Sequence, residues 1–261
     1  MILLLYLALG AVAGLLAGLF GIGGGLIIVP VLVISFAYQG ISPDVLTHMA
    51  IGTSLATIVF TSMSSVKTHQ EKGGVRWEIF KPMAVGIVLG AVLGVFTAAE
   101  LSGPVLQKII GVFALLMAAQ MGFGLKPKPS RDIPGNTGLV GVGTGIGWAS
   151  AIFGIGGGSL SVPFLSWCNV RMQQAVGTSA ACGLPIAVTA ALTNVYKGWG
   201  ESSLPEWSAG FVYLPAFIGI IMTSVYFARI GAKLAHKLSP IMLKRIFAVL
   251  LVIVGLKFLL A

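Results

Sequence analysis

The sequence is poor in charge, above all in acidic charge, and it has two cysteines. Of its 261 residues, 9% are charged and seven are acidic, whereas a soluble domain carries about 25% charged residues. No carboxylate falls clearly inside a hydrophobic segment, which argues against a carrier of metal cations. Cys168 and Cys182 lack metal-ligand spacing and are expected to be small buried side chains. Because no nucleophile–base pair, metal-ligand cluster or ATP-binding loop is recognisable, we expect no enzyme, no metal and no cofactor.

The sequence is rich in long hydrophobic runs. Hydrophobic residues make up 57% of the chain. Five runs approach or reach the about 20 residues that cross a bilayer, namely 2–20, 79–99, 105–125, 208–228 and 241–260. The net charge of +9 would suggest nucleic acid in a soluble protein, but basic loops on one side of a membrane explain it here. We predict an all-α, polytopic integral membrane protein that lies in the lipid bilayer and binds no nucleic acid.

The two halves of the sequence resemble each other. Residues 14–32 match 147–165 at ten of nineteen positions, including an unbroken FGIGGG, and AIGTS at 50–54 matches AVGTS at 175–179. We therefore predict a first repeat over 1–125, a linker over 126–137 and a second repeat over 138–261. Each repeat reads as five hydrophobic segments: 2–20, 26–39, 45–66, 79–99 and 104–125, then 138–153, 158–168, 173–195, 208–228 and 241–260.

An odd number of crossings in each repeat would turn the second repeat upside down. If all ten segments cross, one side receives thirteen Lys and Arg residues and the other receives Lys108, Lys197 and Lys257. Since basic loops stay in the cytoplasm, this asymmetry predicts inverted repeats with both termini outside. The same asymmetry results if the short second segment of each repeat folds back as a re-entrant hairpin. Both alternatives stay open at this stage.

The FGIGGG motif predicts a broken helix in each repeat. Its four glycines do not share one helical face, and Pro30 and Pro163 discourage an uninterrupted helix afterwards. A break frees the N–H groups that begin the next helix, and these can hold an anion. The alternative is that the glycines only make room for neighbouring helices. The candidate substrate-binding glycines are Gly23, Gly24, Gly25, Gly156, Gly157 and Gly158.

The repeated GTS motif supplies hydroxyl groups beside the glycines. We predict that these hydroxyls donate to the oxygens of an anion, although hydroxyls in membrane helices often bond to their own backbone instead. The candidates are Thr53, Ser54, Thr178 and Ser179, and the further candidates are Asn194, Cys182 and His69. By contrast, the glycines spaced four residues apart at 10, 14 and 18, at 86, 90 and 94, and at 143 and 147 predict close helix packing.

The doubled FGIGGG followed by VP, the doubled GTS and the basic loops on one face resemble the sulfite exporter TauE/SafE family of bacterial membrane transporters. The resemblance covers essentially the whole chain. It implies passage of small sulfur-containing anions, such as sulfite, thiosulfate, organosulfonates or sulfoacetate, across the inner membrane.

We therefore hypothesise a secondary transporter in the bacterial inner membrane that moves such an anion by alternating access. A proton or another ion is a candidate coupling partner, and the sequence specifies neither that ion nor the oligomeric state. One alternative is a passive anion channel. Another is an intramembrane accessory protein that handles sulfur or thiols through Cys182.

Overall fold

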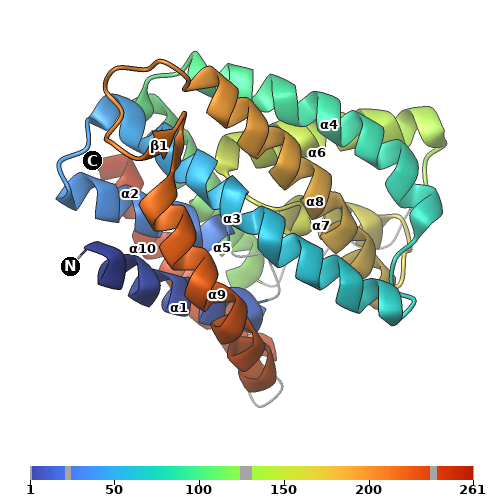
Figure 1. Ribbon diagram of the computed structural model, residues 1–261. Coiled ribbons are helices and arrows are strands. Elements are labelled where there is room, and N and C mark those ends of the chain that lie inside the picture. The colour runs from blue at the N-terminus through green and yellow to red at the C-terminus, as the bar shows by residue number, and fades with distance from the viewer. Residues whose placement is uncertain (1, 21–24, 124–130, 236–239, 261) are drawn as a thin grey trace.

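The structure is a computed structural model that describes residues 2–20, 25–123, 131–235 and 240–260. These residues form ten helices and one short β-hairpin (Figure 1). In chain order the elements are α1 Ile2–Phe20, α2 Gly25–Tyr38, α3 Pro43–Glu71, α4 Trp77–Ala99, α5 Gly103–Gly122, α6 Asn136–Phe153, α7 Gly158–Trp167, α8 Met172–Lys197, β1 Ser208–Ala209, β2 Val212–Tyr213, α9 Leu214–Ala235 and α10 Pro240–Leu260.

The expected all-α architecture is confirmed, with one local correction. Residues 208–213, which the hydropathy assigns to a transmembrane segment, form an antiparallel hairpin in which Ser208 pairs with Tyr213. Gly210, in the turn, has a φ of +54°, a conformation that glycine adopts without strain. The hydrophobicity of these residues is explained by contact with other helices, because Phe211 and Val212 are buried.

Four helices in the described part of the chain are long and apolar enough to cross a membrane: α3, α4, α5 and α8. Two helices are much shorter, since α2 has 14 residues and α7 has 10. At a rise of about 1.5 Å per residue, α2 spans about 21 Å and α7 about 15 Å, less than the about 30 Å of a bilayer core. Neither short helix is therefore long enough to cross alone.

The long helices pack in pairs, and glycines make the pairs close. α3 lies beside α8 near the centre, while α1 lies against α9, α4 against α6 and α5 against α10 (Figure 1). A Cβ on Gly86 or Gly90 of α4 would overlap the backbone of α6, and one on Gly143 or Gly147 of α6 would overlap α4. The predicted packing role of these glycines is confirmed, because each lies directly against the backbone of another helix.

Each short helix returns to the place where the preceding helix began. After α7, the backbone oxygen of Trp167 accepts a hydrogen bond at 3.4 Å from the N–H of Arg131, which lies shortly before α6. After α2, Gln39 is hydrogen-bonded through its side-chain amide to the hydroxyl of Tyr6 near the start of α1, at 2.7 Å. Thus α6 and α7 form a helical hairpin with adjacent ends, and the start of α1 and the end of α2 are likewise adjacent.

The expectation that proline would interrupt the short helices is wrong. Pro30 lies inside α2 and Pro163 inside α7, and both helices continue past them. Each proline is the sixth residue of its helix, so the missing N–H removes a single intrahelical bond near the start. In the second copy, the interruption comes before the helix, at the glycines.

Candidate functional site

The second glycine motif forms a tight turn between α6 and α7. Gly154 ends α6 with a φ of +64°, and the N–H groups of Gly154 and Ile155 both donate to the oxygen of Ser150. A side chain at Gly154 would be strained by this φ, and its Cβ would lie 2.6 Å from Cγ2 of Val29. The predicted break is therefore present in the second copy. Its counterpart at 21–24, including Gly23 and Gly24, lies outside the described residues.

The start of α2 meets this turn directly. A Cβ on Gly25 would lie 2.5 Å from the oxygen of Gly154 and 2.7 Å from Cα of Ile155. Ser54 of α3 donates a hydrogen bond of 2.9 Å to the same Gly154 oxygen. Two predicted site residues, Gly25 and Ser54, thus hold the second glycine turn in place from the other half of the chain.

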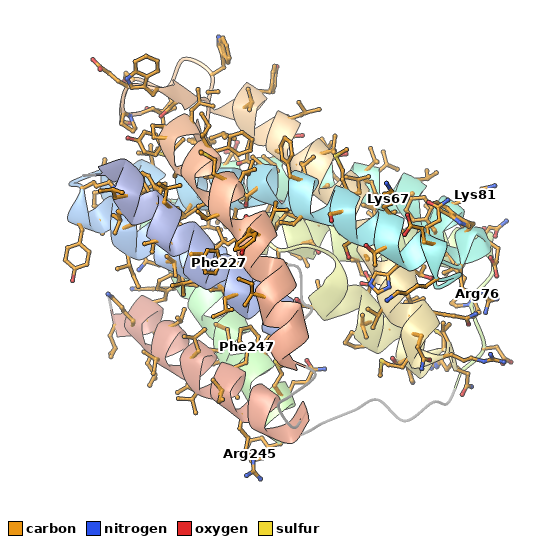
Figure 2. All side chains as sticks on the ribbon, turned by 60° about the horizontal axis from the view of Figure 1, so that its bottom comes forward. Lys67, Arg76, Lys81, Phe227, Arg245 and Phe247 are labelled. Atoms are coloured by element: carbon orange, nitrogen blue, oxygen red, sulfur yellow. The ribbon has the colours of Figure 1, made fainter. Side chains whose placement is uncertain are left out.

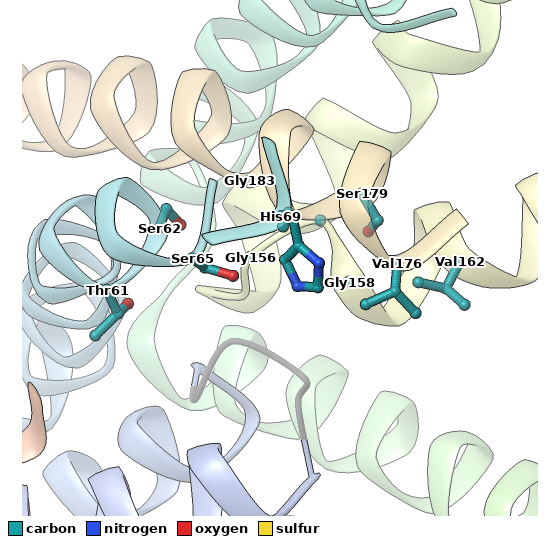
Figure 3. Close-up of a pocket in the computed structure, with 12 residues that line it drawn as sticks. Thr61, Ser62, Ser65, His69, Gly156, Gly158, Val162, Val176, Ser179 and Gly183 are labelled. Carbon is teal, nitrogen blue, oxygen red and sulfur yellow. The ribbon is translucent and has the colours of Figure 1, made fainter. Parts of the chain in front are cut away.

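A cavity of about 80 Å³ lies beside the turn, between α3, α7 and α8 (Figure 3). Gly156, Gly157 and Gly158 form part of its wall, and Ser179 of α8 and His69 of α3 also line it. The structure therefore brings together the second glycine triplet, one of the predicted hydroxyls and one further candidate.

Four other residues of this wall were not among the predicted site residues. Thr61, Ser62 and Ser65 line the cavity from α3, and Gly183 lines it one turn beyond Ser179 on α8. Spacing along the two helices was the available signal, because 61, 62, 65 and 69 recur at helical intervals after the GTS motif.

Several buried hydroxyls around the turn have no hydrogen-bond partner among the described residues. Ser179 is 1% exposed, Ser159 is 6% exposed and Ser161 is 0% exposed, and all three side-chain oxygens are unpaired. α7 begins here, and the first N–H groups of a helix lack intrahelical acceptors. The cavity wall therefore combines the positive end of a helix dipole with an unpaired buried hydroxyl, a combination that suits an anion.

Positive charge gathers toward one end of the molecule. Lys67, Arg76 and Lys81 lie together where α3 ends and α4 begins (Figure 2). Among the described residues that line the cavity, His69 is the one ionisable side chain, and it belongs to the last turn of α3 at this same end. An anion that approaches from this end therefore meets basic side chains before it reaches the glycine turn.

The two GTS threonines have matching partners elsewhere. Thr53 Oγ1 accepts a hydrogen bond of 3.0 Å from the N–H of Tyr213, just before α9, and Thr178 Oγ1 accepts one of 2.9 Å from the N–H of Arg76, just before α4. Both threonines are fully buried, and neither lines the cavity. In the structure, both hydroxyl oxygens accept hydrogen bonds from backbone amides. Anion binding by these two hydroxyls therefore stays a prediction.

The glycine before each threonine explains this arrangement. A Cβ on Gly52 would lie 2.5 Å from the oxygen of Phe211, and one on Gly177 would overlap the backbone of Gly74. In each Gly-Thr pair, the glycine lets another segment of the chain pass close to the backbone of α3 or α8. The threonine hydroxyl then accepts a hydrogen bond from a backbone N–H of that same segment. Sequence reasoning missed this role, although the glycine before each threonine was a usable signal.

Two further candidates lie outside the cavity wall. Asn194 is 4% exposed and donates its side-chain amide to the oxygen of Ala190 at 2.8 Å, while its backbone oxygen accepts from the N–H of Phe211. Cys182 is a free, fully buried thiol behind the turn, where a Cβ on Gly157 would lie 3.6 Å from its Cβ. Within the described residues, no group of three His, Cys, Asp or Glu side chains could hold a metal ion.

An apolar helical bundle with a glycine-built helix break beside a cavity lined by glycines and hydroxyl groups is typical of one class: the multi-pass α-helical membrane transporters. The comparisons with known proteins agree. The model of the sulfite exporter TauE/SafE family matches residues 6–258. The chain is 36% identical to a probable membrane transporter protein of Haemophilus influenzae, over 97% of each chain. It is 28% identical to a probable membrane transporter protein of Methanocaldococcus jannaschii, over 98% of this chain and 95% of the other. The protein belongs to the TauE/SafE family.

Proposed function

We propose that the protein is a secondary transporter that moves a small sulfur-containing anion, of the sulfite, thiosulfate, organosulfonate or sulfoacetate class, across the bacterial inner membrane by alternating access. The observation that carries the proposal is the cavity at the N-terminus of α7, where an unpaired buried hydroxyl faces the glycine turn. Membership of the TauE/SafE family supports the chemical class of the substrate.

The anion is bound by neutral donors. The N–H groups around Gly156, Gly157 and Gly158 and the hydroxyl of Ser179 supply hydrogen bonds, and His69 lies on the same wall. Such donors bind oxyanion oxygens without a permanent counter-charge, so the anion can leave again. A water molecule needs about 10–15 Å³ of such space, so a cavity of about 80 Å³ favours a compact anion. No covalent chemistry is part of this proposal.

Alternating access requires two states, and inverted repeats supply them. We take α1–α5 and α6–α10 as the two repeats, with the boundaries 1–125, 126–137 and 138–261 as predictions. Corresponding contacts support this: α1 packs on α9 as α6 packs on α4. The hydrogen bonds from the amides of Tyr213 and Arg76 to Thr53 and Thr178 also correspond.

The orientation follows from the charges. Lys67, Arg76 and Lys81 mark the cytoplasmic end, and both termini lie on the opposite side. The short helices α2 and α7 are then re-entrant, because each ends beside the beginning of its preceding helix. The cavity, which reaches His69 near the end of α3, is accessible from the cytoplasm in this state.

A panel of anions tests the binding site. Purified protein is titrated with sulfite, thiosulfate, sulfoacetate, taurine and sulfate, and binding is measured by calorimetry. Ser179→Ala should weaken binding of the best anion about tenfold to a hundredfold, since a hydrogen bond to a charged group is worth about 1.5–3 kcal/mol. Ser150→Ala is the matched control, because Ser150 is equally buried and unpaired but does not line the cavity.

If none of the anions binds, or if Ser179→Ala binds as tightly as the parent protein, the proposed site is refuted. Transport itself is tested in proteoliposomes. Saturable uptake that is accelerated by the same anion on the far side supports a transporter, whereas non-saturable uptake without this acceleration supports a passive channel.

A further inference from the structure

His48 is a buried histidine that the anion site does not use. It lies in the second turn of α3 and is 6% exposed. Its Nδ1 is 3.1 Å from the backbone oxygen of Asp44, and its Nε2 is 3.0 Å from the backbone oxygen of Ala98. A neutral imidazole carries one N–H, so one of these contacts would set a nitrogen lone pair against a carbonyl oxygen. An imidazole that has bound a second proton donates to both oxygens.

The surroundings suit a cation. Ala98 belongs to the last turn of α4, where the carbonyl oxygens form the negative end of the helix dipole. The ring of Phe211 stacks on the imidazole with centroids 5.3 Å apart and an interplanar angle of 30°, and an aromatic face attracts a cation. A bound proton is therefore held by two carbonyl oxygens and one aromatic ring.

No carboxylate competes for this role among the described residues. The two carboxylates on its own helix, Asp44 and Glu71, are both exposed. Glu100, just after α4, forms an ion pair of 3.9 Å with Lys197 of α8. None of the described charged groups is ion-paired to the imidazole. At the same ends of the elements packed around His48, the titratable and charged groups are Asp44 on α3, Glu100 after α4, Lys108 on α5, Tyr196 and Lys197 on α8 and Tyr213 on β2. The other such groups on α3 and α4 lie at the opposite ends of those helices: Lys67, His69, Glu71, Glu78 and Lys81.

His48 lies where three elements meet. It joins α3 to the end of α4 through Ala98 and to the β-hairpin through Phe211. The hairpin is in turn bonded to α3, where Thr53 accepts from Tyr213, and to α8, where the oxygen of Asn194 accepts from the N–H of Phe211. Protonation of His48 therefore affects the contacts that hold α3, α4, α8 and the hairpin together at this end.

The opposite end has no such group at the matching position. The offset of 125 residues that relates the two GTS motifs relates His48 to Gln173 at the start of α8. A glutamine amide does not titrate, so a proton at this position can act on one end of the molecule alone. An asymmetric site of this kind lets a proton on one side of the membrane bias an otherwise symmetric pair of states.

We propose that His48 is the proton-binding residue of this transporter. The bound proton ties α3 to α4 and the hairpin and keeps that end closed, and release of the proton loosens the same contacts so that the end can open. This inference rests on the proposed transport function. The closing contacts are complete while the imidazole holds two protons, because both ring nitrogens then donate, and they weaken when one proton leaves.

Nitrogen NMR tests the protonation directly, without transport. The chain has three histidines, so protein labelled with ¹⁵N-histidine gives few signals, and His48→Gln assigns the relevant pair. At the acid end of a titration between pH 5 and 8 we expect two protonated ring nitrogens whose hydrogens exchange slowly with solvent, and one of these hydrogens should be lost as the pH is raised. One protonated nitrogen throughout pH 5 to 8 would overturn the inference.

Transport tests the consequence. In proteoliposomes, an imposed pH difference of one unit should change accumulation of the anion about tenfold for one coupled proton, and His48→Gln should abolish this dependence while anion exchange between the two sides continues. His69→Gln is the matched control, because it makes the same chemical change at the other end of α3. It should alter anion affinity and keep the pH dependence.

The outcomes separate the two proposals. If the parent protein exchanges anions but ignores the pH difference, or if His48→Gln keeps the dependence, the role of His48 is refuted and the anion transporter stands. If no anion binds or exchanges at all, the proposed function fails, and the NMR result still decides whether His48 holds two protons.

Discussion

Replacement of Thr53 by valine separates the two roles that its hydroxyl could have. Thr53 is fully buried, and its Oγ1 accepts the N–H of Tyr213 at 3.0 Å. Valine keeps the shape of the side chain and removes the acceptor, so the amide of Tyr213 is left buried and unpaired. Such a loss costs about 1–3 kcal/mol. For a chain of this size the melting temperature should fall by about 2–12 °C, while the affinity for the anion should stay unchanged.

Thermal unfolding in detergent, followed by fluorescence, measures the first quantity, and calorimetric titration measures the second. Thr57→Val is the control, because Thr57 is equally buried on the same helix but donates to its own helix, at the oxygen of Ser54. It leaves no amide unpaired, so its effect should stay below about 1 kcal/mol. Equal melting temperatures for the two variants, or weaker anion binding by Thr53→Val without destabilisation, would refute the structural role and favour the hydroxyl as an anion ligand.

Three further predictions concern the glycines and the thiol. Gly90→Leu should prevent folding, because the leucine side chain would overlap the backbone of α6. Gly145→Leu should give monodisperse protein in size-exclusion chromatography, because Gly145 has open space around it. Similar elution of the two variants would contradict this prediction. Gly157→Val should insert normally and lose anion uptake, since its methyl groups would occupy the cavity wall, and uptake at the parent rate would count against the site. Cys182→Ser should largely retain transport, because the thiol lies outside the cavity wall, and complete loss would favour the thiol-handling alternative.

The positions at which most helices begin and end were predictable, because they depend on the local amino-acid composition. Hydrophobic runs, such as 79–99, gave helix bounds within two residues of those observed for α4. The glycine cluster at 154–158 marked the break, since no side chain other than hydrogen fits a φ of +64° at Gly154 without strain. The hairpin at 208–213 was missed, because its apolar residues are buried against the bundle and carry the same hydropathy as a membrane helix.

Parts of the candidate site depend on contacts that sequence spacing does not encode. The residues on one face of α3 that line the cavity could be grouped by helical periodicity, but the choice of Ser179 over Thr178 could not. Adjacent residues on α8 point to different neighbours, so Ser179 lines the cavity and Thr178 accepts the amide of Arg76. The same holds for His48, whose partner Ala98 lies 50 residues away.

The sequence by itself determined that this chain is a helical membrane protein, where its helices run, and that glycine breaks one of them beside hydroxyl-bearing segments, because hydrophobic length and glycine conformation act within a few residues. Only the tertiary structure decided which hydroxyls stay unpaired for a ligand and which hold backbone amides, and that both nitrogens of His48 meet carbonyl oxygens. Those outcomes depend on how α3, α8 and the crossing segments pack, and a hydrogen bond forms only between groups that packing brings within about 3 Å.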